Sequence, residues 1–167
     1  MPQSPWRLRS LQPGDIGWVI ARHGEIYSSE FGWDGTFEYL VAEIAAGVMK
    51  TFDPARENAW IAERDGIRLG AVFLVGAGGE AAKLRMLIVD PAARGLGIGA
   101  RLVAECTSFA RAAGYRRITL WTHSILTAAR RLYAAEGYVL TSSAPLRAFG
   151  VELTEETWDL DLTGRIG

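Results

Sequence analysis

A glycine-rich turn, Arg94-Gly95-Leu96-Gly97-Ile98-Gly99, has the residue types and spacing most suited to chemistry in this chain. It follows the apolar run Leu84–Val89 and the pair Asp90-Pro91, and it leads into a helix-like segment, Ala100–Ala113. A strand that ends in such a turn and opens a helix presents backbone N–H groups and the positive end of the helix dipole, which suit a phosphate. The Arg94 guanidinium would add a cation that matches phosphate oxygens. The pattern predicts an anion site. The same residues also fit an ordinary strand-to-helix turn in which the glycines serve close packing.

Two common phosphate-binding loops do not account for this turn. The loop of nucleotide hydrolases needs Gly-x-x-x-x-Gly-Lys-Ser/Thr, and the sequence has no such string. A dinucleotide fold needs Gly-x-Gly-x-x-Gly early in a repeated strand-helix-strand unit. Here the spacing is Gly-x-Gly-x-Gly, and several predicted strands and helices precede it. The first type of loop is therefore excluded by its missing string, and the second by its spacing and its position in the chain.

The predicted elements around the turn form a mixed pattern. Periodicity and turn residues predict a strand, two helices, three strands, and then helix, strand, helix and two closing strands. Asp15 is predicted to cap the first helix and Thr36 the second, and a long loop is expected between the last two strands. The predicted elements are Trp6–Leu11, Ile16–Tyr27, Phe37–Val48, Ala59–Arg64, Leu69–Val75, Lys83–Val89, Ala100–Ala113, Arg117–Thr122, Leu126–Ala135, Tyr138–Thr141 and Thr157–Leu162.

This order, β-α-α-β-β-β-α-β-α-β-β, predicts an α/β (α+β) fold with a mixed central sheet of about seven strands and about four helices on both faces. Neither an internal repeat nor a linker divides the sequence. We therefore expect one domain over residues 6–163, preceded by a disordered N-terminus, residues 1–5.

Composition narrows the class of protein. A net charge of −1 gives no broad attraction to nucleic acid, and the single cysteine excludes an internal disulfide or a cysteine-rich zinc site. Cys106 has helical spacing with Leu102 and Phe109, which indicates a core residue. The longest apolar run, Leu69–Ala77, is too short to cross a bilayer, and no secretory signal is visible at the start. We expect a cytoplasmic protein without membrane, nucleic-acid or metal partners.

Two strings resemble a known superfamily. Arg94-x-x-Gly97-x-Gly99 resembles the coenzyme A motif of the GNAT superfamily of N-acetyltransferases. The downstream segment 129–138, ARRLYAAEGY, resembles its alanine, leucine-tyrosine and glycine-aromatic pattern. Shorter strings such as Phe52–Arg56 and Trp158–Leu160 are similar to acetyltransferase domains fused behind MarR-type regulators. The helix-turn-helix module of those relatives has no counterpart here.

The resemblance implies acetyl-CoA as co-substrate, held in a cleft where two central strands separate. The backbone of Leu87, Ile88 and Val89 would pair with the pantetheine arm, and Arg94, Gly95, Leu96, Gly97, Ile98, Gly99 and Ala100 would hold the pyrophosphate. Tyr133 aligns with the family tyrosine that contacts the coenzyme sulfur and would act as general acid. Alternatively, Tyr133 is an aromatic core residue that packs between helix and sheet.

The base and the acceptor site are less specified by the sequence. His123, at the end of a predicted strand beside the cleft, is the candidate base, because the pKa of a histidine lies near neutral pH. Alternatively, His123 is a strand-end residue that caps the next helix. Trp33, between glycines, is predicted as an exposed lid of the pocket. Arg85 is expected on the same strand face as Leu87 and Val89, where it could bind a substrate carboxylate. Glu30 is a further candidate, and the loop over 144–156 would gate the site through Arg147 and Phe149.

The sequence therefore predicts an N-acetyltransferase that transfers the acetyl group to the amine of a small molecule or to an exposed amino group. Direct attack in a ternary complex is the expected mechanism. A non-catalytic acetyl-CoA sensor or a helper domain on the same fold is the alternative. A homodimer is compatible with the six tryptophans and the apolar C-terminal strand.

Overall fold

A seven-stranded sheet forms the centre of the computed structural model, which describes residues 5–164. The strand order is β1-β2-β3-β4-β5-β7-β6, and all neighbours are antiparallel except the parallel pair β4–β5. The predicted fold class and order of strands and helices are confirmed. The elements are β1 (Arg7–Arg9), α1 (Asp15–Phe31), α2 (Gly35–Lys50), β2 (Asn58–Arg64), β3 (Ile67–Gly76), β4 (Ala81–Val89), the short 3-10 helix η1 (Pro91–Ala93), α3 (Ile98–Ala112), β5 (Arg117–His123), α4 (Thr127–Glu136), β6 (Val139–Ala148) and β7 (Val151–Asp161).

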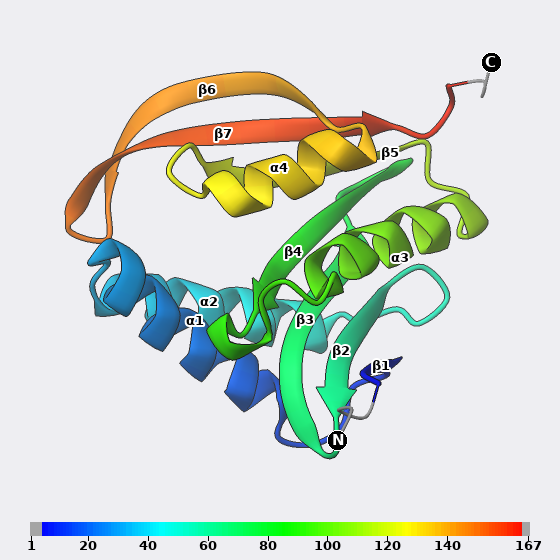
Figure 1. Cartoon of the computed structure of the whole chain (residues 1–167). Coiled ribbons are helices and arrows are strands. Elements are labelled where there is room, and N and C mark those ends of the chain that lie inside the picture. The colour runs from blue at the N-terminus through cyan, green and yellow to red at the C-terminus, as the bar shows by residue number, and fades with distance from the viewer. Residues whose placement is uncertain (1–4, 165–167) are drawn as a thin grey trace.

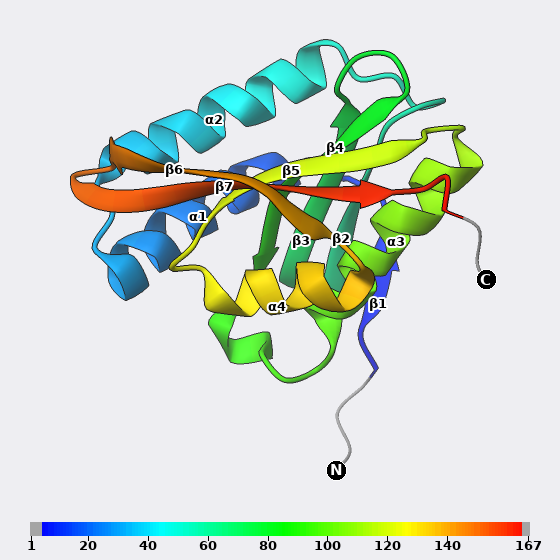
Figure 2. The ribbon, with the colours of Figure 1, turned by 90° about the horizontal axis from the view of Figure 1, so that it is seen from above.

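Helices cover both faces of the sheet, α1 and α2 on one side and α3 and α4 on the other (Figures 1 and 2). On the first side, Val19 and Ile26 of α1 pack against Ile61, Phe73 and other buried strand residues. On the second side, a larger apolar cluster joins α3 and α4 to the sheet and includes Cys106, as predicted. Because strand side chains alternate between the two faces, the apolar runs of β3 and β4 contribute to both clusters.

Several element ends differ from the sequence prediction. Asp15 is not the cap of α1, since Gly14 precedes the helix in a left-handed conformation and Asp15 is its first, fully buried residue. Asp34, not Thr36, caps α2 and accepts a hydrogen bond from the Thr36 backbone N–H at 2.9 Å. The sequence predicts a disordered N-terminus over residues 1–5, and residues 1–4 of it lie outside the described residues.

The predicted long loop before the last strand is wrong. β6 and β7 pair from Val139 opposite Asp159 to Ala148 opposite Val151, and they form a long hairpin. Its turn residues, Phe149 and Gly150, both have positive φ, as in the tight turns that favour hairpins. β6 is an edge strand with mostly exposed side chains, so it lacks the apolar alternation by which a strand is recognised.

A bulge in β4 overturns the predicted direction of Arg85. Phe73 pairs with Arg85 and Ala71 with Ile88, so one β3 residue faces two residues of β4. Met86, inside this bulge, has a φ of 54°. The extra residue reverses the alternation, so Arg85 shares the α1–α2 face with Ile88 and not the face of Leu87 and Val89.

A buried carboxylate fixes where α1 begins. Asp15 accepts hydrogen bonds from Arg9 at 2.8 Å, from Arg68 at 2.7 Å and from the Gln12 backbone N–H at 2.6 Å. Burial alone would raise the pKa of this carboxyl, but the two guanidinium groups and the N–H outweigh it and lower the pKa to about 2. Because Arg9 lies on β1 and Arg68 on β3, the cluster ties the start of α1 to the sheet.

Asp15→Asn should lower the free energy of unfolding by about 3 kcal/mol at neutral pH, because it leaves two arginines beside an uncharged side chain. The stabilisation by Asp15 is present above the ordinary pKa of 3.8 and is lost as the pH falls toward about 2, so the two proteins should converge there. Urea unfolding between pH 7 and pH 2 measures this, with Glu43→Gln, an exposed acid on α2, as control. A gap that stays constant across the range would contradict the assignment.

Candidate active site

The β4 and β5 strands separate after a short common stretch. They pair only at Ala81–Lys83 against Arg117–Thr119, although β4 continues to Val89 and β5 to His123 (Figure 1). The rest of the β4 edge that faces β5 therefore has no strand partner. A groove of about 620 Å³ lies beside it. It is lined by the end of β4, the glycine-rich turn, the end of α1 and the starts of α3 and α4.

The glycine-rich turn opens α3 as predicted, although the helix begins at Ile98 and not at Ala100. Gly95 and Gly97 have φ values of 83° and 78°, and a Cβ at either position would meet no atom within 4 Å. Their left-handed conformation needs glycine, and the space above them is open. The first N–H groups of α3, from Ile98 to Ala100, have no helical carbonyl to bond. The turn thus has the geometry of an anion site.

Most of the residues predicted to hold the coenzyme line this groove together. They are Leu87, Ile88, Val89, Arg94, Gly95, Gly97, Ile98, Gly99 and Ala100. Leu96 is exposed and does not line it. Gly99 has a packing role as well, because a Cβ there would come within 2.6 Å of Leu132 on α4. Both interpretations of the glycines therefore apply to different positions of the same turn.

Glu30 lies in the groove and not with the other predicted acceptor residues. Its carboxylate forms an ion pair with Arg94 at 2.5 Å, which joins the end of α1 to the glycine-rich turn. Arg94 and Glu30 keep part of their side chains in solvent, so a surface pair of this kind contributes little to stability. The pair places the Arg94 guanidinium at the mouth of the groove.

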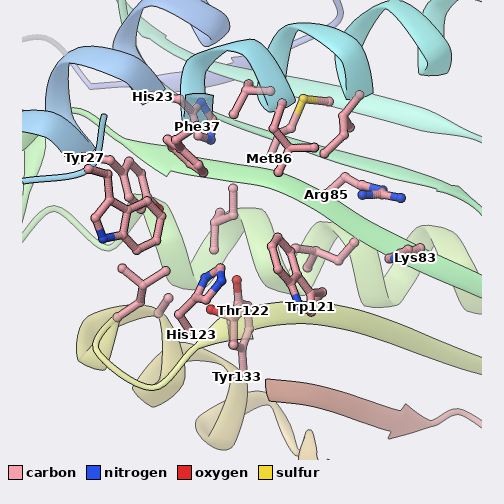
Figure 3. Close-up of a pocket in the computed structure, with 18 residues that line it drawn as sticks. His23, Tyr27, Phe37, Lys83, Arg85, Met86, Trp121, Thr122, His123 and Tyr133 are labelled. Atoms are coloured by element: carbon pink, nitrogen blue, oxygen red, sulfur yellow. The ribbon is translucent and has the colours of Figure 1, made fainter. Parts of the chain in front are cut away.

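A second cavity, of about 100 Å³, continues from the groove toward α1 and α2. Tyr27, Leu87, Leu126 and Ala129 line both spaces. Its wall also holds Trp33, Arg85, His123 and Tyr133, four residues predicted for the site, so the structure brings these together (Figure 3). Arg147, by contrast, is exposed and pairs with Glu152 in the hairpin.

Tyr133 is both a core residue and a wall of the second cavity. Its ring packs 5.7 Å from that of Tyr138, within the apolar cluster under α3 and α4. Burial raises the pKa of the Tyr133 phenol above its ordinary value of 10.0. The phenol is therefore protonated at neutral pH.

His123 ends β5 inside the cavity and does not cap α4, whose N-cap is Leu126. It is 2% exposed, and its Nε2 has no hydrogen-bond partner among the described residues. Burial lowers the pKa of His123, and the nearby carboxylates of Glu155 and Glu156 oppose that shift. The imidazole is thus neutral at pH 7, with a nitrogen free to engage a ligand.

The predicted exposed lid at Trp33 is wrong, because the side chain is only 2% exposed. Its ring stacks on Phe149 at 4.9 Å and contacts Tyr27 and Phe37 at 5.0 and 4.8 Å. The backbone N–H of the next residue, Asp34, donates to the Phe149 carbonyl at 3.0 Å. The hairpin turn therefore fixes Trp33 as part of the cavity wall.

His23 is a cavity residue that the sequence analysis did not single out. It is 4% exposed, lines the second cavity and donates from Nδ1 to the Val19 carbonyl at 2.7 Å. Burial lowers its pKa to about 4. Its spacing of four residues from Val19 and three from Ile26, both buried, is the signal that places it on the inner face of α1.

Comparison with known proteins decides the family. Residues 55–140 match the family described as acetyltransferase (GNAT) domain. An uncharacterized N-acetyltransferase of Schizosaccharomyces pombe is 33% identical over 117 residues, 69% of this chain and 71% of that protein. The chain belongs to the GNAT acetyltransferases. The acetyl donor of this family is acetyl-CoA.

Solved structures share the fold of this GNAT acetyltransferase. The yncA protein of Salmonella typhimurium, determined with its cofactor acetyl-CoA, has a TM-score of 0.77 at 17% identity, over 98% of each chain. An N-acetyltransferase from Staphylococcus aureus Mu50 has a TM-score of 0.78 at 19% identity, over 96% of this chain and 100% of that one.

Residues 5–164 of the acetyltransferase contain no cluster of three or more His, Cys, Asp or Glu residues arranged for a metal ion. None of the helices within this range has the length and apolar character needed to cross a membrane.

Gly97→Glu should weaken acetyl-CoA binding by at least 100-fold, because it puts a carboxylate where the turn offers N–H groups to a phosphate. Calorimetry of acetyl-CoA binding measures the effect. Gly114→Glu is the matched control, since Gly114 also has a left-handed φ, 87°, with open space but follows the far end of α3. Equal affinities in the two variants would remove the phosphate site from this turn.

Proposed function

We propose that this GNAT enzyme transfers the acetyl group of acetyl-CoA to a primary amine of a small molecule, by direct attack in a ternary complex. The observation that carries the proposal is that the open groove beside β4 meets the second cavity at Leu87, Leu126 and Ala129, with Tyr133 in the wall of that cavity. The groove would hold the donor and the cavity the acceptor. Their junction is where an amine and a thioester would come together.

The groove has two features that fit the donor. The backbone of Leu87, Ile88 and Val89 is not paired with β5, so it offers hydrogen-bonding groups to the amides of a pantetheine arm. The turn from Arg94 to Ala100 offers N–H groups and a guanidinium to a pyrophosphate. When bound, acetyl-CoA supplies an acetyl thioester as the activated acyl group. A backbone N–H near Leu87 or Ile88 would stabilise the negative charge that develops on the carbonyl oxygen.

Proton transfer would use the polar groups of the cavity. A primary amine, with a pKa of about 10.4, is mostly protonated at neutral pH and must lose a proton before it attacks. Neutral His123 would accept that proton at Nε2, directly or through water. As the new C–N bond forms and the C–S bond breaks, the Tyr133 phenol would give its proton to the departing thiolate.

Other predictions for this enzyme stay predictions. They include the boundaries of the domain at residues 6 and 163, the kinship with domains fused to MarR-type regulators, the cytoplasmic location and the homodimer. The roles of Trp33, Arg85 and Glu30 toward the acceptor also belong here. Of these three, Trp33 and Arg85 line the acceptor cavity, and Glu30 lies beside Arg94.

Tyr133→Phe should lower kcat by about 100-fold and leave the acetyl-CoA dissociation constant within about twofold, because only the proton donor is lost. Release of free coenzyme A thiol with a panel of primary amines measures kcat. Tyr138→Phe is the matched control, since it removes a neighbouring buried phenol that does not line the cavity. An unchanged rate in Tyr133→Phe would make this residue a packing anchor alone.

His123→Asn should remove the acidic limb of the pH–kcat profile and lower kcat at pH 7 by about 100-fold. Because burial lowers the pKa of His123, the limb in the unmodified enzyme should lie below the ordinary value of 6.5, with activity rising as the proton leaves. His23→Asn is the comparison. If the limb is lost in His23→Asn and kept in His123→Asn, the base is His23.

A further inference from the structure

Two cationic side chains without counter-ions among residues 5–164 lie on one wall of the acceptor cavity. Lys83 and Arg85 lie two residues apart on β4, opposite Val75 and Phe73, and both line the cavity. Neither forms an ion pair or side-chain hydrogen bond within residues 5–164, whereas arginines such as Arg9, Arg68 and Arg130 pair with carboxylates. Both are partly removed from water, and burial lowers the pKa of each. Keeping two like charges together without a partner costs free energy that a bound anion would recover.

The two acids whose charges act on His123, in the cavity wall, already have partners. Glu155 accepts a hydrogen bond from Trp121 Nε1 at 2.9 Å, and Glu156 accepts from Arg130 at 2.9 Å and from Trp158 Nε1 at 3.1 Å. No Asp or Glu is among the residues that line the cavity. The other titratable groups there are two histidines with lowered pKa values and two tyrosines, Tyr27 and Tyr133, with raised ones. The wall is therefore positive at neutral pH.

The cavity has different chemistry at its two ends. Figure 3 shows Arg85 and Lys83 at one end, away from His23 and His123. The side chains of Met86 and Trp121 lie between the ends, and Phe37 lies beside His23. Leu87, where donor groove and cavity meet, is two residues from Arg85 and four from Lys83 along β4. Because the bulge at Met86 lies between Arg85 and Leu87, these distances are shorter than the roughly 13 Å that four residues of a regular strand would span.

We propose that the acceptor is an anionic amine, a small molecule whose primary amine and carboxylate are separated by an apolar or aromatic segment. The carboxylate would bind Arg85 and Lys83, the apolar segment would lie against Trp121 and Met86, and the amine would reach the junction at Leu87. The inference rests on the proposed function, because it assigns the acceptor of that reaction. A polyamine or a neutral amine lacks the group that the two cations require.

The test compares probes of one shape and different charge. Calorimetry measures the binding of 4-(aminomethyl)benzoate and of 4-(aminomethyl)benzamide to the enzyme saturated with coenzyme A, which permits binding without turnover. The carboxylate should bind about 10- to 100-fold more tightly than the amide, as expected for charge-assisted hydrogen bonds. Arg85→Gln should abolish this preference. Arg111→Gln, at an exposed arginine on α3 that forms no ion pair with any described residue, should keep it.

The proposal is overturned if neither probe binds, if the amide binds as well as the carboxylate, or if Arg85→Gln keeps the preference. An intact coenzyme A affinity in Arg85→Gln shows that the variant is folded. Thiol release from acetyl-CoA separates this proposal from the proposed function. Turnover of neutral amines without a carboxylate preference overturns the anionic acceptor alone, whereas no turnover with any amine overturns the transferase assignment.

Discussion

The separation of β4 from β5 is the constraint on which the rest of the site depends. β4 pairs with β3 along most of its length but with β5 at only three register positions. The bulge at Met86 lies just beyond that common stretch, and bulges bend a strand and increase its twist. The result is a central strand with a free edge beside the start of a helix. Few other places in a sheet offer both extended-chain pairing and an anion site.

The same bulge divides the site into a donor side and an acceptor side. Beyond it, Leu87 and Val89 pack toward α3 and α4, and before it Lys83 and Arg85 face α1 and α2. The acceptor side is then closed by contacts distant in sequence. Asp15 anchors the start of α1, and the Asp34 to Phe149 hydrogen bond holds the hairpin turn against Trp33. These contacts hold α1 and the hairpin turn in place around the acceptor cavity.

Structural features that depend on a local sequence pattern were predicted well. The glycine-rich turn and the buried Cys106 are each specified by a few neighbouring residues, and the structure has them in place. Features set by distant contacts were missed. Trp33 is buried by Phe149, more than a hundred positions away, and Arg85 changes face because of one extra residue in β4. The start of β6 was predicted as a strand, Tyr138–Thr141, but the rest of it was predicted as a loop, because an edge strand with exposed side chains lacks apolar alternation.

The thioester must lie where the groove and the cavity meet if the acceptor, the proton donor and the base are to act as proposed. A crystal structure of the enzyme with coenzyme A bound tests this placement most directly. We expect pyrophosphate oxygens within hydrogen-bonding distance of N–H groups between Gly95 and Ala100, and a sulfur atom at Leu87 facing the Tyr133 hydroxyl. A pyrophosphate bound away from this turn, or a sulfur directed out of the cavity, would contradict this placement.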